Sequence, residues 1–477
     1  MFGWFSTKCP LGTWEKTWTE SRMGWLAQRL GIDRLMNAEV ILPTERHFPD
    51  PYHQDVGDVQ RMTERMRGYM GIAPHTIEVA VCADGAITGA AGVYYQRSDG
   101  EERSHIYVAE SQLAEPMALA ATLAHELAHE ILLGGGILTT EVGDHEWITD
   151  LLQVYVGVGI FAANATVYER NFREGRSSWT VMGKQGYLPS RMYGYALALF
   201  AWVRGENRPA WTEHLRRDAR TAFDDGMRYL AKTGDSLFRP AMDHHYRSLS
   251  GEEANGRLRS GTATVRLATL WEIERQALTT PECLAAVTER LRDDDAAVAC
   301  DAARLLPRFG VAARAAVPTL LACLDDRREE VRAGAAEALG ELATGDEAVG
   351  GKVAYLLRDE SQAVVSACAV ALTQLGVRLD ESLAKDLLAR LEKALIECDH
   401  ASVEPLARAV LATTAKPKQA IRAFYEGKDP ELRRLSLQAI EEQSSKKPCD
   451  DEGSSKQPAL VPLSERLPRR PPEGLPG

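Results

Sequence analysis

A 33-residue repeat in the second half of the chain is the sequence feature that most restricts its fold. Four sets of apolar residues recur at this interval: Leu291, Leu324 and Leu357; Val298, Val331 and Val364; Ala303, Ala336 and Ala369; and Leu306, Leu339 and Leu372. Each unit reads as a short helix, an acidic turn and a second helix with one apolar face. Because neither helix can bury its apolar face alone, neighbouring units are expected to stack into an α-solenoid.

These units resemble HEAT repeats of the short type. The resemblance is carried by segments such as AVPTLL at residues 316–321, which is followed by EVRAGAAEALG at residues 330–340. Two degenerate units follow, around Val403–Leu411 and Leu432–Ile440. The resemblance implies an all-α HEAT-type solenoid over residues 262–442, with a concave surface suited to binding protein.

The composition changes at both ends of this repeat region. Residues 1–240 are rich in Trp, Tyr and Gly and contain three strand-like segments among helical ones. These segments are Thr76–Ala83, Ala90–Gln96 and Ser104–Val108. Residues 241–261 are polar and contain Gly and Ser, which is typical of a linker. Residues 443–477 place prolines among charges, and because such a segment has too little apolar surface to offset its ordering entropy, we expect a disordered tail.

The pentapeptide HELAH at residues 125–129 is the strongest chemical signal in the N-terminal region. It lies in the apolar segment Met117–Leu133, which is expected to be helical. Since residues four apart share one helix face, His125 and His129 can hold one metal ion while Glu126 lies beside it. This spacing predicts a zinc site with a general base next to it.

A third protein ligand is needed, because a catalytic zinc site has three protein ligands and one position for water. Glu146 is the first candidate: a helix that begins near Asp144 places Glu146 and Asp150 on one face. Asp150 then accepts the outer N–H of one of the two histidines and fixes its orientation. The alternative third ligands are His145, Asp144 and Glu141.

This arrangement resembles the gluzincin metallopeptidases, which carry H-E-x-x-H on one helix and a metal-binding Glu on the next, with an Asp four residues further on. The resemblance implies an α+β zincin-like domain, with a small sheet and active-site helices, over residues 1–240. Glu130 departs from the pattern, because the residue after the second histidine is usually uncharged. Residues 40–52 and 194–202 are also similar to segments of an uncharacterised bacterial family that carries the same His-Glu pair.

The chemistry expected of such a site is amide hydrolysis. Zinc activates a water molecule, Glu126 accepts its proton, and the carbonyl group polarised by the metal is attacked. A further donor is needed for the developing oxyanion, and the segment at residues 186–195 offers several. We rank Tyr187 and Arg191 first among them.

The net charge and the cysteine pattern restrict which partners the protein can bind and in which cellular compartment it is expected. A net charge of −12 leaves no basic stripe for phosphate neutralisation, so nucleic acid is not an expected partner. The longest near-apolar run, Leu151–Ala163, is shorter than the roughly 20 residues of a membrane span. The eight cysteines are scattered without a C-x-x-C pair, as in a reducing compartment. We therefore expect a cytoplasmic protein.

Two functions remain open at this point. The first is a zinc-dependent peptidase whose HEAT solenoid recruits a protein or peptide substrate or a regulator. The second is a non-catalytic scaffold with a structural or degenerate zinc site, in which the solenoid carries the function by binding protein. The presence of Glu126, which coordinates nothing, favours the first.

Overall fold

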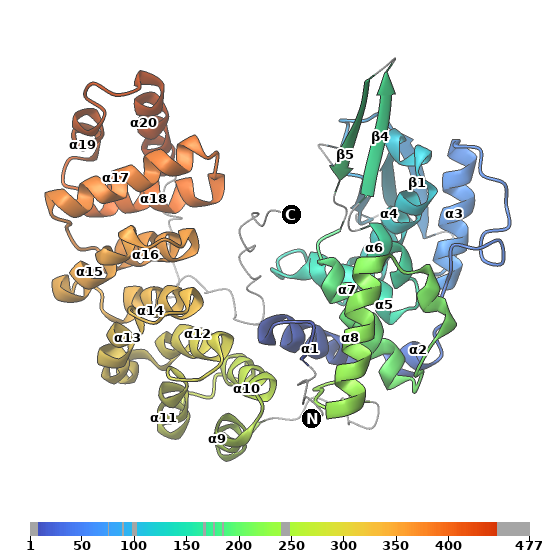
Figure 1. Cartoon of the computed structure of the whole chain (residues 1–477), viewed down its shortest axis with the longest axis horizontal. Coiled ribbons are helices and arrows are strands. Elements are labelled where there is room, and N and C mark those ends of the chain that lie inside the picture. Colours follow the sequence, from blue (N-terminus) through green and yellow to red (C-terminus); the bar gives the residue numbers. More distant parts are fainter. Residues whose placement is uncertain are drawn as a thin grey trace, which may run out of the picture. The chain divides into compact units, whose positions relative to one another are not determined.

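The computed structural model describes residues 8–445, except residues 75, 88–89, 98–102, 166–167, 175–176, 184–185 and 240–248. The chain divides into two compact units, Met1–Arg247 and Ser248–Gly477 (Figure 1). The boundary expected between residues 240 and 241 falls on residues outside this description, as does nearly all of the expected disordered tail. Each unit is described by itself below.

The N-terminal unit is mostly helical and carries one small three-stranded sheet. Its helices are α1 (Thr13–Leu30), α2 (Ile32–Met36), α3 (Val56–Tyr69), η1 (Glu110–Ala114), α4 (Pro116–His129), η2 (Glu130–Gly134), α5 (His145–Tyr155), α6 (Gly159–Ala165), α7 (Ser190–Val203), η3 (Ala210–His214) and α8 (Arg217–Thr233). Its strands are β1 (Ile77–Cys82), β2 (Gly92–Tyr95), β3 (Ser104–Ala109), β4 (Tyr168–Glu174) and β5 (Ser177–Gly183). The three-stranded sheet has the order β1-β3-β2.

The three strand-like segments of the sequence form this sheet. β3 lies in the middle, parallel to β1 and antiparallel to β2. Its alternate residues Ser104, Ile106 and Val108 are buried, while His105 and Tyr107 are partly exposed, as the two-residue period of a strand requires. The small sheet is therefore confirmed. The antiparallel β4–β5 hairpin was not predicted, because the sequence after α6 was interpreted as largely helical.

Helix α4 is the central element of this unit. Pro116 opens its first turn, where the missing N–H costs no helical hydrogen bond. Leu119, Leu123 and Leu127, each four residues apart, are fully buried and form the apolar row by which the helix packs. After His129 the helix continues as a single π turn, η2, that begins at Glu130. π turns of this kind are often found at functional sites.

Helix α5 is held in place from its N-terminus. Asp144 precedes the helix and accepts hydrogen bonds from Trp18 Nε1 (2.7 Å) and Arg22 Nε (2.8 Å), both on α1. Trp147 packs edge-on against Trp14 and Trp18, with ring centroids 6.2 Å and 5.3 Å apart. α1 therefore fixes where α5 begins, and with it the position of the side chains on the first turn of α5.

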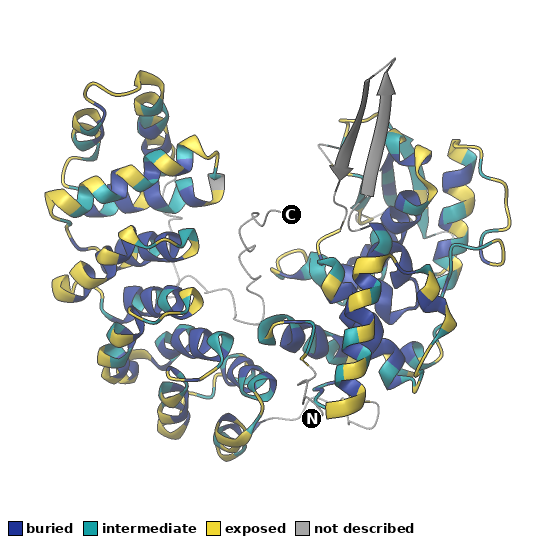
Figure 2. Cartoon of the chain, in the orientation of Figure 1, coloured by how far each residue is buried: buried dark blue, intermediate teal, exposed yellow. Residues whose placement is uncertain are grey.

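The second unit consists of paired helices in sequence order. They are α9 (Gly251–Ser260), α10 (Ala263–Arg275), α11 (Pro281–Arg290), α12 (Ala296–Leu305), η4 (Leu306–Ala316), α13 (Val317–Cys323), α14 (Glu329–Leu342), α15 (Glu347–Ala354), η5 (Tyr355–Arg358), α16 (Gln362–Leu375), α17 (Glu381–Ile396), α18 (His400–Thr413), α19 (Pro417–Phe424) and α20 (Pro430–Ser445). All twelve residues of the four repeated sets are buried, at 5% exposure or less. Buried residues are concentrated along α12, α14 and α16 in Figure 2. The repeat prediction is confirmed.

Ion pairs between successive repeats add to the apolar stacking. Arg266 on α10 binds Asp293 (2.6 Å), which lies in the acidic turn of the next repeat. Arg332 on α14 binds Asp359 (2.7 Å) in the same way. The acidic turns that the sequence shows therefore also connect one repeat to the next.

The prediction of a linker over residues 241–261 is wrong for residues 251–260, which are helical. Residues 251–260 form α9, which opens with a capping box: Ser250 Oγ accepts from Glu253 N and the Glu253 carboxylate accepts from Ser250 N, each at 3.1 Å. Ala254 and Leu258 are fully buried. The polar residues interpreted as a loop are the solvent-facing side of an amphipathic helix, so the repeat region begins earlier than predicted.

One described stretch, Ala296–Cys323, has the length and apolar composition of a membrane-spanning helix. In the structure it is broken into α12, η4 and α13, with Gly310 at φ 59° and ψ −140° between them. Val298 and Leu306 within it are buried in the repeat core. Packing in the core of the solenoid accounts for the apolar composition of this stretch.

Truncation of a repeat residue tests this core. Leu339→Ala removes a fully buried side chain of α14 and should lower the free energy of unfolding of the solenoid by about 2–5 kcal/mol. Val311→Ala is the matched control, since Val311 is 78% exposed and its truncation should cost less than about 0.5 kcal/mol. Urea denaturation followed by circular dichroism measures both, and equal losses would contradict the assigned core.

Candidate metal centre

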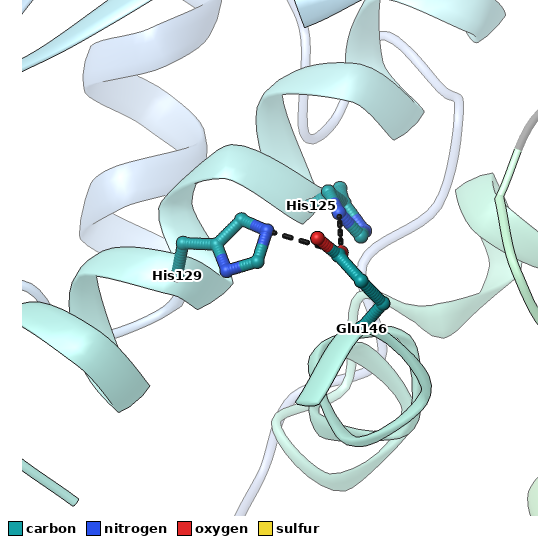
Figure 3. A group of neighbouring side chains, drawn as sticks. All are labelled: His125, His129 and Glu146. Atoms are coloured by element: carbon teal, nitrogen blue, oxygen red, sulfur yellow. Dashed lines mark hydrogen bonds and ion pairs between the residues drawn. The ribbon is translucent and has the colours of Figure 1, made fainter. Parts of the chain in front are cut away.

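The three predicted ligands come together between α4 and α5 (Figure 3). Glu146, on the first turn of α5, places Oε2 at 3.1 Å from His125 Nε2 and 3.3 Å from His129 Nε2. One ligand atom from each residue lies within 4.8 Å of the others. The histidine spacing within α4 and the position of α5 together create this cluster.

The donor set of the cluster and two of its three ligand separations suit a zinc ion. Bond lengths of about 2.0–2.2 Å in a tetrahedral site place neighbouring ligand atoms about 3.4 Å apart. The separations of 3.1 Å and 3.3 Å from Glu146 to the two histidines are close to this value. Two imidazoles and one carboxylate are also a donor set that zinc prefers, and they leave one position of the tetrahedron free. The residues present therefore fit the metal that the sequence predicts.

Asp150 lies where an outer carboxylate was predicted, one turn after Glu146. Its Oδ1 accepts a hydrogen bond from His125 Nδ1 (2.8 Å). Its Oδ2 accepts from the backbone N–H groups of Tyr187 (2.7 Å) and Leu188 (2.9 Å). Because Asp150 accepts a hydrogen bond from Nδ1, the Nε2 atom of His125 is the nitrogen that would give its lone pair to a metal ion.

His129 is oriented by Thr149. The Thr149 hydroxyl donates to the carbonyl oxygen of His145 (2.8 Å), so its lone pair faces His129 Nδ1 at 3.4 Å. With a metal bound, Nδ1 of His129 would keep its proton and Nε2 would be free to bind the metal. Both imidazoles thus present the same nitrogen to the space between α4 and α5.

The two histidines differ in their affinity for protons. Burial disfavours the charged form of His125, but hydrogen bonds to Asp150 and Glu146 outweigh burial and hold its pKa well above the ordinary value. For His129, burial lowers the pKa and the bond to Glu146 does not compensate. In the absence of metal, His125 carries the positive charge of the pair.

The pKa values of the two glutamates of the site, Glu146 and Glu126, are shifted in opposite directions. Burial would raise the pKa of Glu146, but hydrogen bonds to His125 and His129 outweigh it and lower the pKa well below the ordinary value. Burial raises the pKa of Glu126 to about 7. Glu146 is thus ionised as a ligand must be, while Glu126 has the proton affinity of a general base at neutral pH.

The two residues predicted as oxyanion donors, Tyr187 and Arg191, lie in different surroundings. Tyr187 lies at the site, where its ring stacks on that of His125 with centroids 5.7 Å apart. Arg191, on the first turn of α7, instead forms an exposed ion pair with Glu15 of α1 (2.5 Å). The helix turns Arg191 toward α1, so of these two residues Tyr187 is the one that lies at the site.

The alternative third ligands are placed around the centre. Asp144 accepts from Trp18 and Arg22 on the same oxygen, Oδ2, and Glu141 is exposed to solvent. His145 Nδ1 lies 2.9 Å from the carbonyl oxygen of Val142, while its Nε2 lies 3.3 Å from Glu146 Oε1. His145 therefore contacts the ligand Glu146, and Glu146 is the residue that faces both histidines.

Three residues next to the site were not identified from the sequence. The carboxylate of Glu130 accepts hydrogen bonds from the hydroxyls of Tyr94 (2.6 Å) and Ser104 (2.7 Å), and the Tyr94 ring stacks on His129. Glu130 had been noted only as a departure from the zincin pattern. No local signal reveals these contacts, because the strands that supply the hydroxyls lie 26 and 36 residues earlier in the chain.

A cavity of about 410 Å³ lies on another side of α4. It is lined by apolar residues that include Phe48, Met62, Met117, Ala120 and Phe161. At 100° per residue, Met117 and Ala120 point away from the face that carries the two histidines. The cavity is therefore not part of the candidate metal centre.

Substitution of Asp150 tests the electrostatics of the centre without any metal. Asp150→Asn removes the negative charge beside the imidazolium, so the pKa of His125 should fall by about one unit or more. The imidazole resonances, followed by NMR against pH in the presence of a chelator, measure this change. Asp218→Asn, an exposed substitution on α8, should leave the pKa unchanged. An unaltered His125 pKa in Asp150→Asn would contradict the assigned hydrogen bond.

Comparisons with known proteins bear on the repeat region. A profile of HEAT repeats matches residues 284–350. The complex of CpcE and CpcF of phycocyanin lyase from Nostoc sp. PCC7120 is 23% identical over 42% of this chain and 78% of that chain, with a TM-score of 0.30. An engineered protein is 19% identical over 41% of this chain and 96% of that chain, with a TM-score of 0.28. No curated protein matches the chain. The profile match supports HEAT-type repeats in the second unit.

Proposed function

We propose that the N-terminal unit is a zinc-dependent hydrolase of peptide amide bonds and that the HEAT solenoid binds a protein partner or substrate. The observation that carries the first part is Glu126. It is buried, is not one of the three candidate ligands, and has its pKa raised by burial to about 7. A purely structural metal site has no use for such a group.

The roles of the residues follow from their positions. His125, His129 and Glu146 would hold the metal, which when bound supplies a Lewis acid that polarises a carbonyl group and activates water. Asp150 orients His125 through Nδ1. Glu126 accepts a proton from the attacking water and returns it to the leaving amine, for which a pKa near the working pH is best.

Tyr187 is the proposed donor to the developing oxyanion. Burial raises the pKa of its hydroxyl to about 12, so the group keeps its proton at neutral pH and can donate it in a hydrogen bond. Its backbone N–H is anchored on Asp150, which also orients His125. The proposed donor and one ligand are thus held by the same carboxylate.

The second candidate function is a non-catalytic scaffold. It is favoured by the HEAT-repeat match, which supports a helical repeat scaffold, whereas no comparison supports a peptidase. In this alternative the zinc site is structural or degenerate, and the solenoid acts by binding protein. The two candidates differ in whether Glu126 is needed for any activity.

Zinc content and cleavage, measured together, separate the two candidates. The unmutated protein should contain one zinc per chain by atomic absorption, Glu146→Ala should lose it, and Glu126→Gln should retain it. Cleavage of a peptide library should disappear in Glu146→Ala and fall by about 10²–10⁴-fold in Glu126→Gln. Absence of zinc from the unmutated protein would end the metal proposal, and full zinc without cleavage of any peptide would favour the scaffold.

Tyr187→Phe tests the proposed oxyanion donor. It removes one hydroxyl and keeps the ring that stacks on His125, so zinc content should not change. The value of kcat should fall by about 10²-fold, as for the loss of one oxyanion donor. Arg191→Lys, at the exposed ion pair with Glu15, is the control and should leave kcat unchanged. If Tyr187→Phe keeps full activity, the hydroxyl has no such role.

A further inference from the structure

We infer that Glu130 is a positioning residue, which holds strand β2 against helix α4 through Tyr94 and so keeps Glu126 and His129 in register. The structural part of this inference concerns the chain alone. Its consequence for catalysis rests on the proposed function. Glu130 is the residue that departs from the zincin sequence pattern, and its contacts give that departure a physical reason.

Glu130 is a buried carboxylate with two hydroxyl donors. Its Oε2 accepts from Tyr94 Oη at 2.6 Å and from Ser104 Oγ at 2.7 Å, and the residue is 7% exposed. Hydrogen bonds from hydroxyls to an ionised acceptor are short and about twice as strong as neutral ones. One side chain of the π turn after α4 thus binds both β2 and β3.

Tyr94 contacts the site at three points. Its hydroxyl donates to Glu130, its ring stacks on His129 with centroids 5.9 Å apart and planes 21° apart, and its backbone N–H faces the carboxylate of Glu126, where it acts to lower the pKa of that group. The same residue therefore touches the second histidine and the proposed base. A shift of Tyr94 along or away from α4 changes both contacts together.

Two glycines make this close approach possible. A Cβ on Gly92 would lie 2.5 Å from Thr122 Cγ2 and 3.0 Å from Glu126 Oε1, so only glycine lets β2 lie this close to α4. A Cβ on Gly134 would lie 2.5 Å from Glu130 Oε2. Gly92 thus lets β2 approach α4, and Gly134 leaves room for the Glu130 carboxylate and the Tyr94 hydroxyl.

The far end of β2 is attached to the same turn. Gln96, just after the strand, donates from Nε2 to the carbonyl oxygen of Leu133 at 3.1 Å. The strand is therefore held on the metal helix at Tyr94 and at Gln96. Of these contacts, the one to the Glu130 carboxylate is charge-assisted and therefore the strongest.

Hydrogen exchange in the metal-free protein tests the structural part directly. Tyr94→Phe keeps the ring and removes the hydroxyl, and Glu130→Gln keeps the shape and removes the charge. In both variants the backbone amides of residues 92–95, followed by mass spectrometry in a chelator, should exchange about ten- to hundredfold faster. Tyr95→Phe is the matched control, because Tyr95 is adjacent in sequence and 53% exposed, and it should exchange as the unmutated protein does.

The catalytic consequence is measured on zinc-loaded protein. Tyr94→Phe should retain zinc and KM for a cleaved peptide, but lose about tenfold or more in kcat, because Glu126 and His129 are no longer held in register. Replacement of zinc by cobalt should show an altered visible spectrum in the same variant. Unchanged exchange of residues 92–95 in both variants overturns the inference. Absence of zinc or of cleavage in the unmutated protein overturns the proposed function and leaves the exchange result intact.

Discussion

The carboxylate of Asp150 is the contact on which the rest of the candidate site depends. Both of its oxygens accept hydrogen bonds: Oδ1 accepts from His125 Nδ1 and Gln153 Nε2, and Oδ2 accepts from two backbone N–H groups of the segment before α7. A buried carboxylate must be satisfied in this way, because leaving it unpaired costs far more than any single hydrogen bond returns. Helix α4, helix α5 and the Tyr187 segment are therefore held together at one point.

The charges of the site favour a cation. Glu126, Glu146 and Asp150 bring three carboxyl groups into a region with two imidazoles, and burial acts against every charge among them. In the metal-free chain, His125 compensates by holding a proton. A divalent ion between His125, His129 and Glu146 would displace that proton and balance the carboxylates directly. In the metal-free chain, burial raises the pKa of Glu126 to about 7.

The two units are stabilised by different kinds of interaction. The solenoid is stabilised by repetition: apolar faces at a fixed interval, with ion pairs such as Arg332–Asp359 between repeats. Its HEAT character is supported by the profile match, and protein binding follows as its proposed role. The N-terminal unit depends on single contacts between distant segments, such as Asp144 with Trp18 and Arg22. One substitution at such a contact is therefore expected to change the site more than one substitution in a repeat changes the solenoid.

Sequence alone determined the features that depend on local periodicity. The i, i+4 spacings put His125 with His129 and Glu146 with Asp150, and the 33-residue interval defined the buried faces of the repeats. Tertiary structure decided what local spacing does not contain. Packing of α5 against α4 brings Glu146 to His125, the first turn of α7 directs Arg191 toward Glu15, and the sheet gives Glu130 its hydroxyl partners. The physical reason is that helix periodicity acts over four residues, whereas these contacts join segments more than 15 residues apart, whose approach is set only by the packed core.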